Sequence, residues 1–368
     1  MKSFVTCIIL FAFLQQELND PLSLAKSKNT IKPAGNLFII TIDGFRWQEV
    51  FTGADASLIN NEKYTADTAI MKMLYWSADA EGRRKKLLPF FWNVIAAKGQ
   101  LYGNREYDNN VNTSNLYSIS YPGYNEIFTG NTDNEINSNH KNINPNINVL
   151  EYLNSKEAFK GKVAAFTSWD VFPYILNKER SGIVLNSGYE TMNEDNDEAQ
   201  QLISRVQDEA VYDKGETRHD ELTFLTAKQY IQKHQPKVVF LGLGETDEAA
   251  HKGQYDIYLE KAGEADRMIA QLWRWVQTTP GYKNNTTFII TTDHGRGQRA
   301  GKWRDHGNMI SGSSQTWLAV LGPNIRAVGE VKQDQQLYQE QLAQTIATLL
   351  GEKFESNARV ADAISLNQ

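Results

Sequence analysis

The chain has 368 residues, of which 41% are hydrophobic and 22% are charged, and its net charge at pH 7 is −6. This composition is typical of a globular protein, and the length allows one large α/β domain. Nucleic-acid polymers are excluded as the main partner, because binding them needs clustered Lys and Arg and the sequence has no long basic block.

The N-terminus carries Lys2 and then an apolar run from Phe4 to Leu14. This run is too short to span a bilayer but fits a secretory signal peptide, with small residues near Ala25 at the cleavage position. We expect a signal peptide over residues 1–25 and a single domain over 26–368, and a buried N-terminal helix is the alternative. Cys7, the only cysteine in the sequence, would be removed with the cleaved signal peptide. Export without cysteine favours the bacterial periplasm, and no other segment is apolar enough to span a membrane.

Five apolar runs predict strands that are buried on both faces. Their continuous apolarity is typical of a parallel sheet covered by helices. The runs are residues 36–43, 162–168, 237–245, 286–293 and 316–323. Residues 261–277 and 338–351 have helical spacing. The alternation predicts an α/β fold with a doubly wound, mostly parallel sheet, helices on both faces and room for small cap or insert elements.

Acidic residues stand at the ends of three predicted strands. Asp43 ends the first strand, Glu245 and Asp247 follow the run that begins at 237, and Asp293 ends the run that begins at 286. Ligands of open α/β sheets bind at the carboxyl ends of the strands. Carboxylates gathered there repel one another unless a cation lies between them, so the pattern indicates bound cations.

Histidines accompany these acids. Asp247 and His251 are four residues apart, so on a helix both can reach one ion. His294 follows Asp293 directly, and His306 belongs to a second Asp-His-Gly twelve residues later. Mixed Asp and His ligation suits dications such as Zn²⁺, and three of each suit two metals about 4 Å apart. Each pair alone is more often a solvated helix face or a turn, but the ordered set at strand ends favours metal binding.

A nucleophile is predicted at Ser120, which precedes Tyr-Pro-Gly and a helix-like segment. Pro122 is tolerated in the first turn of a helix, which places Ser120 near a helix N-terminus that favours anions. The alternative is a serine that only caps the helix.

The ordered motifs resemble the alkaline phosphatase superfamily, in particular the branch of nucleotide pyrophosphatase/phosphodiesterases and related metal-dependent phosphatases. The segments "NLFIITIDGFR", "SYPGYNEIFTG", "DEAAH" and "TTDHG" are each similar to a family motif, as is "TIATLLG" near the C-terminus. The resemblance runs from about residue 36 to 352. In the diesterase branch a long insertion usually separates the Asp-His pair from the last histidine. Here His294 and His306 are only twelve residues apart.

The resemblance implies an alkaline-phosphatase-like catalytic domain and a role for each matched residue. One metal would be held by Asp247, His251 and His306. The other would be held by Asp43, Asp293 and His294, with Ser120 at its open position. Ser120 would attack phosphorus and form a phosphoserine that water then hydrolyses.

The function implied is a secreted hydrolase of phosphomonoesters or phosphodiesters, and a phosphomutase or phosphotransferase on the same two metals is the alternative. The sulfatase signature Cys/Ser-x-Pro-x-Arg is absent after Ser120. A binding protein without activity is a third reading, which the intact Ser120 and ligand set disfavour. The metals are expected to be Zn²⁺, with Mn²⁺ also compatible, and the partner is a small phosphorylated substrate. The oligomeric state stays open.

Groups that would bind substrate are less well defined by the sequence. The loop after the Ser120 segment offers Asn137, Asn139 and Asn142 to hold a phosphoryl oxygen. Trp169 follows a predicted strand and could stack on a leaving group, or it could be a core aromatic. The loop between the two Asp-His-Gly copies offers Lys302 and Arg304 for a phosphate, with solvation at the surface as the alternative. Asp305 either orients an imidazole or has no role.

Overall fold

The computed structural model describes residues 33–192 and 197–366. The predicted signal peptide and Cys7 lie outside the described residues. Within the described part of the chain, no helix is both long enough and apolar enough to cross a membrane.

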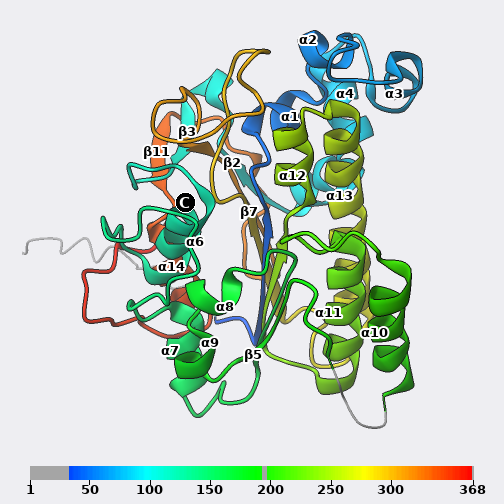
Figure 1. The fold of residues 1–368 in the computed structure, drawn as a ribbon. Coiled ribbons are helices and arrows are strands. Elements are labelled where there is room, and N and C mark those ends of the chain that lie inside the picture. The colour runs from blue at the N-terminus through cyan, green and yellow to red at the C-terminus, as the bar shows by residue number, and fades with distance from the viewer. Residues whose placement is uncertain (1–32, 193–196, 367–368) are drawn as a thin grey trace, which may run out of the picture. The chain divides into compact units, whose positions relative to one another are not determined.

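An eight-stranded sheet forms the centre of the fold, in the order β10-β2-β9-β7-β1-β6-β4-β5 (Figure 1). The neighbours from β7 to β5 pair in parallel, as do β10 and β2. Its strands are β1 (Asn36–Ile42), β2 (Gly99–Tyr102), β4 (Val163–Thr167), β5 (Val184–Ser187), β6 (Val238–Leu243), β7 (Thr286–Thr291), β9 (Leu318–Leu321) and β10 (Gly329–Glu330). A smaller sheet has the order β11-β3-β8, with β3 (Asn109–Asn112), β8 (Gln315–Thr316) and β11 (Gln335–Tyr338). The predicted α/β class with a mostly parallel sheet is confirmed.

The strand predicted over 316–323 differs from a parallel strand in its direction. It is present as β8 and β9, but β9 runs antiparallel to both of its neighbours, β7 and β2. All of its residues are buried. Continuous apolarity reports burial on both faces, and an antiparallel strand inside a covered sheet is buried in the same way, so the pattern did not reveal the direction.

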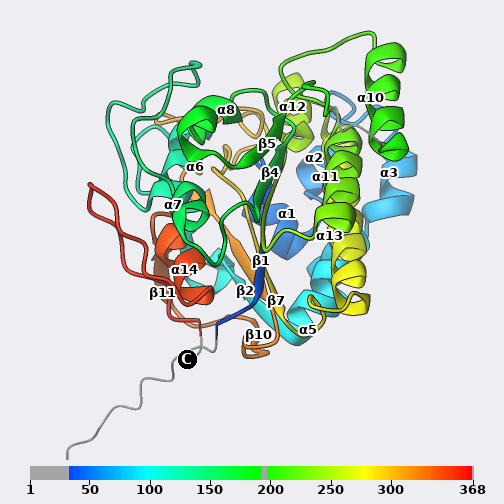
Figure 2. The ribbon, with the colours of Figure 1, turned by 90° about the horizontal axis from the view of Figure 1, so that it is seen from below.

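Helices cover both faces of the sheet, as Figures 1 and 2 show. One face packs a core against α1 (Trp47–Thr52), α2 (Ala56–Ile59), α3 (Thr68–Tyr75), α4 (Ala80–Leu87), the π-helix η1 (Phe91–Ile95), α5 (Ala96–Lys98), α11 (Asp220–His234), α12 (Glu245–Lys252) and α13 (Tyr255–Thr278), with α10 (Glu198–Ala210) against α11. The other face packs a second core against α6 (Ser120–Thr129), α7 (Val149–Ser155), α8 (Phe172–Ile175) and α14 (Gln341–Leu349), with α9 (Lys178–Ser181) against α7 and α8. A short 3₁₀ helix, η2 (Arg105–Tyr107), precedes β3.

Both predicted helices are present with shifted bounds. The segment 261–277 lies inside the longer α13, and the segment 338–351 becomes α14, which begins at Gln341 because the residues before it pair as β11. The central order β7-β1-β6 matters most for function, since it places the carboxyl ends of three parallel strands side by side.

Candidate active site

Three neighbouring strand ends bring three aspartates together. Asp43 follows β1, Asp293 follows β7, and Asp247 lies in the first turn of α12, directly after β6. The Nε2 atom of His294 lies 3.6 Å from Asp43 Oδ1, 3.3 Å from Asp293 Oδ2 and 3.7 Å from Asp247 Oδ1. The carboxylates therefore surround one imidazole nitrogen, as the positions of these residues in the sequence predicted.

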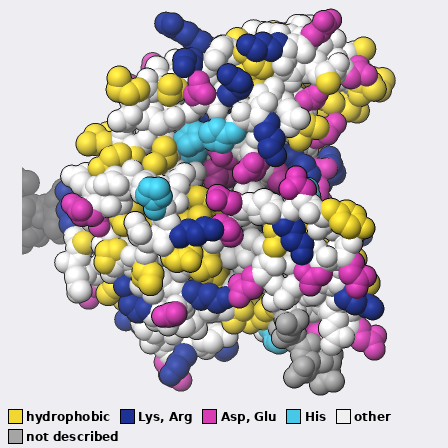
Figure 3. All heavy atoms as spheres, in the orientation of Figure 1, with side chains coloured by type: hydrophobic (Ala, Val, Ile, Leu, Met, Phe, Trp, Pro, Cys, Tyr) yellow, Lys and Arg dark blue, Asp and Glu magenta, His cyan; other side chains and the backbone are white. Residues whose placement is uncertain are grey.

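The remaining two histidines complete the cluster on the α12 side. His251 and Asp247 lie on α12 one turn apart, and His251 Nε2 is 3.1 Å from Asp247 Oδ2. The Nε2 atoms of His251 and His306 are 3.0 Å apart. The rings of His294 and His306 are stacked, with centroids 3.8 Å apart. Figure 3 shows histidine side chains gathered beside acidic side chains in a hollowed part of the surface.

The second nitrogen of two imidazoles is already engaged. His294 Nδ1–H donates to the Gly295 carbonyl at 2.9 Å, and His306 Nδ1–H donates to the Ser118 carbonyl at 3.2 Å. In both rings this arrangement leaves Nε2 with its lone pair directed into the cluster. Such neutral imidazoles are the form that binds a metal.

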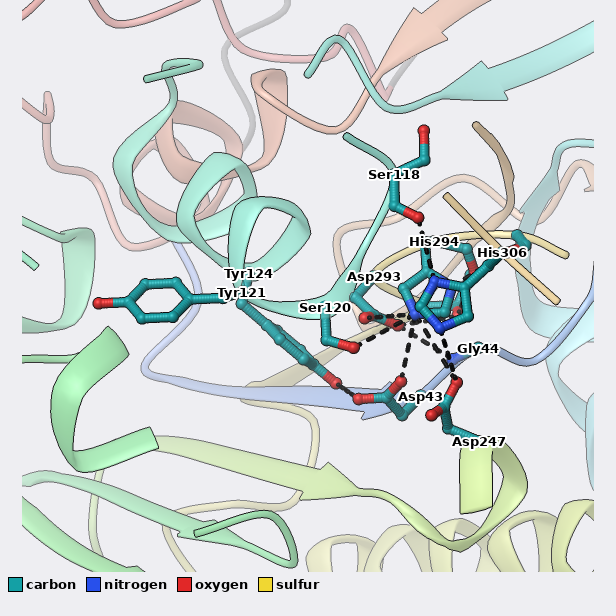
Figure 4. A network of polar contacts seen from close by, with 12 residues as sticks. Asp43, Gly44, Ser118, Ser120, Tyr121, Tyr124, Asp247, Asp293, His294 and His306 are labelled. Carbon is teal, nitrogen blue, oxygen red and sulfur yellow. Dashed lines mark hydrogen bonds and ion pairs between the residues drawn. The ribbon is translucent and has the colours of Figure 1, made fainter. Parts of the chain in front are cut away.

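Ser120 lies at the edge of the cluster, as Figure 4 shows. It is the first residue of α6, the cap position belongs to Ile119, and the serine side chain caps nothing. Its Oγ is 3.3 Å from His294 Nε2, although the residue is only 5% exposed. The reading of Ser120 as a mere helix cap is therefore wrong, because its hydroxyl points into the acid and histidine cluster.

The buried carboxylates of the cluster need a nearby positive charge to be stable in their ionised form. Burial raises the pKa of Asp43 well above its ordinary value, with the Asp293 carboxylate adding to the rise, and burial raises the pKa of Asp293 to about 6. Burial also lowers the pKa of His294 and of His306, so both are held neutral. Asp43 Oδ1 and Asp293 Oδ2 are buried without a hydrogen-bond partner. Such oxygens are costly unless a cation binds them.

Within this cluster, two groups of side chains have ligand atoms close enough to share an ion. One contains Asp43, Asp293 and His294, and the other contains Asp247, His294 and His306. The donor chemistry of carboxylate oxygens and imidazole nitrogens fits two divalent metals. The structure thus brings together all seven residues that the sequence selected for the metals and the nucleophile.

Tyr124 was not predicted as a site residue. Its hydroxyl donates to Asp43 Oδ2 at 2.9 Å from the interior of α6. Tyr124 lies four residues after Ser120, so the two side chains share one face of the helix. This spacing is a signal in the sequence that could have identified it.

Arg296, also in the loop between the two Asp-His-Gly copies, has a fully buried guanidinium whose hydrogen bonds all go to the protein. It donates to the carbonyl of Gly44 at 3.1 Å, to the carbonyl of Arg304 at 2.6 Å and to the carboxylate of Asp247. It thereby joins the β1 turn, α12 and the loop that leads to His306. Nothing in the sequence distinguished it from the other basic residues of that loop.

The loop asparagines differ in their distance from the nucleophile. Asn139 Oδ1 accepts a hydrogen bond from the backbone N–H of Tyr121, the residue after Ser120, at 3.0 Å. Asn142 approaches the same helix through its carbonyl, which accepts from the Tyr121 hydroxyl at 2.6 Å. The amide of Asn137 donates to a carbonyl within its own loop. Of the three side chains, the Asn139 amide contacts the nucleophile helix.

Trp169 is half-buried, and its backbone pairs with Thr217 near the carboxyl ends of β4 and β6. Its ring meets the edge of Phe172, which belongs to the core, at a centroid distance of 6.2 Å. Trp169 therefore combines a contact with the core and an exposed portion, and both readings from the sequence stay open.

Lys302 and Arg304, in the loop between the two Asp-His-Gly copies, differ in how near they lie to the acid and histidine cluster. The ammonium of Lys302 pairs with Asp305 at 3.2 Å, and both side chains are exposed. Asp305 therefore does not orient His306, whose partner is a backbone carbonyl. Arg304 packs against Gly253 at the C-terminal end of α12, beside the turn that carries His251, and its Nε is buried without a partner. Arg304 thus lies nearer to the cluster than Lys302.

Comparisons with known proteins agree with this geometry. The sequence model described as Metalloenzyme superfamily matches residues 186–350. The solved structure of wild-type alkaline phosphatase PafA is 12% identical, with a TM-score of 0.60, and the alignment covers 92% of this chain and 100% of that chain. The phosphonate monoester hydrolase of Agrobacterium radiobacter is 13% identical, with a TM-score of 0.55 and coverage of 91% and 76%. The lipoteichoic acid synthase LtaP from Listeria monocytogenes is 12% identical, with a TM-score of 0.54 and coverage of 91% and 75%.

A search of curated proteins gives no match. The family model covers less than half of the chain, and these solved structures show that the chain shares the alkaline-phosphatase-like fold that the resemblance of the motifs implied.

Proposed function

From this resemblance and the site geometry, we propose that the protein is a two-metal phosphohydrolase that cleaves phosphomonoesters or phosphodiesters through a phosphoserine on Ser120. One observation carries the proposal. The Oγ of Ser120 lies at the N-terminus of α6 and 3.3 Å from the imidazole nitrogen around which the three aspartates converge. A serine that served only the fold would not need its hydroxyl beside an imidazole that three buried or half-buried carboxylates surround.

Each ion has a defined set of candidate ligands. Asp247, His251 and His306 would hold the first metal, and Asp43, Asp293 and His294 would hold the second beside Ser120. When bound, the two dications would favour the ionised serine hydroxyl and offset charge on the transferring phosphoryl group. Zn²⁺ is the ion we propose, and Mn²⁺ has compatible ligand preferences.

The reaction is a double displacement at phosphorus. Ser120 Oγ forms a bond to phosphorus and releases its proton to solvent, while the bond from phosphorus to the leaving oxygen breaks and that oxygen takes up a proton. A water molecule then attacks the phosphoserine and loses a proton, while the bond between phosphorus and Ser120 Oγ breaks and that oxygen regains a proton. The N-terminus of α6 helps both steps, because its free N–H groups and the helix dipole favour an anion.

Asn139 is the loop residue that we assign to the phosphoryl group. Its Oδ1 is engaged by the Tyr121 N–H, while its Nδ2 has no hydrogen-bond partner among the described residues. The amide nitrogen is therefore free to donate to a phosphoryl oxygen bound next to Ser120. Arg304 is the cation we assign to the opposite, α12 side of the site, where the leaving group departs in an in-line displacement.

The experiment is a comparison of substrates on the zinc-reconstituted protein. We expect release of nitrophenol from p-nitrophenyl phosphate, from bis-p-nitrophenyl phosphate, or from both, and a fall in kcat of at least about 10³-fold in Ser120→Ala. Ser181→Ala is the matched control, since Ser181 is a buried serine of α9 whose hydroxyl donates to the Lys178 carbonyl at 3.3 Å. Unchanged turnover in Ser120→Ala would remove the proposed nucleophile.

A phosphomutase or phosphotransferase on the same two metals is the alternative. Incubation with a phosphoglycerate separates the two functions, because a mutase would isomerise this substrate without releasing phosphate. We further propose export to a bacterial periplasm, supported by the charged and apolar pattern of residues 1–25. Cell fractionation with N-terminal sequencing of the mature protein would test this location.

A further inference from the structure

Glu126 carries a buried carboxylate that the proposed reaction does not use. It lies on α6, the helix that begins with Ser120, and it is fully buried. Its oxygens accept four hydrogen bonds, from Ser114 N at 2.6 Å, Asn115 N at 3.0 Å, Asn115 Nδ2 at 2.8 Å and Glu340 N at 3.1 Å. No cation of residues 33–192 or 197–366 pairs with it, so these N–H groups stabilise the charge.

Asn115 connects Glu126 to the loop that precedes Ser120. Its Nδ2 donates to Glu126, and its Oδ1 accepts from Tyr117 N at 3.1 Å and from Ser118 N at 2.8 Å. The side chain is only 8% exposed. Asn115 therefore closes a turn over residues 115–118 and ties that turn to α6.

Ser118 ends the turn with its carbonyl directed at His306. Its φ of 47° lies in the left-handed region, which is uncommon for a residue with a side chain and needs support from its surroundings. Figure 4 shows the Ser118 carbonyl pointing to the His306 ring, from which Nδ1–H donates at 3.2 Å. The loop thereby sets the orientation of this imidazole and directs its Nε2 towards Asp247 and His251.

We infer that Glu126 and Asn115 are positioning residues. They hold His306, a proposed ligand of the first metal, at a fixed position relative to Ser120. The chain of contacts runs from Glu126 through Asn115 to the Ser118 carbonyl and then to His306. Because Ser120 and Glu126 share α6, a movement of the nucleophile helix moves the imidazole with it, and their separation is held constant. This inference rests on the proposed function, since it assigns His306 to a bound metal.

The test is zinc binding by the full-length protein, measured by competition with a chromophoric chelator. We expect Asn115→Ala to bind one of two zinc ions about 10- to 100-fold more weakly, as is typical when the partner of a metal-bound histidine is disturbed. The other ion, held by Asp43, Asp293 and His294, should keep its affinity. Glu126→Gln should act in the same direction, because its amide would direct N–H groups at backbone donors.

Asn148→Ala is the matched control. Asn148 is also fully buried, donates its amide to the Leu176 carbonyl and caps α7 by accepting from Glu151 N, away from the cluster. Its loss should lower stability but leave both zinc affinities unchanged.

Two results would overturn the inference. Zinc affinities in Asn115→Ala and Glu126→Gln that equal those of Asn148→Ala would show that the turn has only a structural role, while the proposed function would stand. A wild-type protein that binds no zinc would refute the proposed function and this inference together. If Asn115→Ala does not fold, Glu126→Gln alone decides, with ¹⁵N shifts of the histidine side chains reporting whether His306 keeps its Nδ1–H.

Discussion

Removal of the metal should make the stability of the protein depend on pH through its buried acids. Burial raises the pKa of Asp293 from 3.8 to about 6 and also raises that of Asp43. Such an acid binds more protons in the folded state than in the unfolded state. The stabilising contribution of Asp293 is therefore present below about pH 4 and is lost as pH rises to about 6. For Asp293, a shift of about two pKa units corresponds to about 3 kcal/mol.

The perturbation is Asp293→Asn in protein stripped with a chelator. For a chain of this length, about 3 kcal/mol corresponds to about 4 °C in Tm. Between pH 4 and 7, calorimetry should show that metal-free wild type loses about 4 °C relative to the variant. Zinc added at pH 7 should stabilise the wild type by mass action and stabilise the variant much less. Equal pH dependence of the two metal-free proteins would refute this reasoning.

Three further substitutions test other parts of the structure. Gly123→Ala should lower kcat at least about tenfold with zinc content unchanged, because a Cβ there would lie 2.5 Å from the Asp293 carbonyl and push Ser120 out of place; normal kinetics would contradict this. Trp303→Ala should cost about 3–5 kcal/mol in urea unfolding, since three tyrosine rings pack around the indole, and Trp303→Phe should cost less. Burial raises the pKa of Asp266 to about 7, so between pH 4 and 8 the wild type should lose about 4 kcal/mol relative to Asp266→Asn, and a constant difference would exclude this cause.

Local patterns predicted the parts of the site that depend on one turn of chain or one strand end. Asp247 and His251 share a face because residues four apart coincide on any helix, and the helix is present as α12. Asp43 and Asp293 stand at the ends of apolar runs whose continuous apolarity predicted buried strands of a covered sheet, and the strands are present as β1 and β7. The ordering of these motifs along the chain implied, by resemblance, the alkaline-phosphatase-like fold that the structure has.

The sequence by itself therefore determined the strand ends, the helical pair and the start of α6, since each follows from neighbours along the chain. Only the tertiary structure decided that β9 runs antiparallel and that the Arg296 guanidinium donates to the Asp247 carboxylate. It also decided that His306 is oriented by the carbonyl of Ser118, which lies 188 positions away in the sequence. The physical reason is that a buried donor must find some acceptor, but which acceptor lies within reach depends on how strands and loops distant in sequence pack together.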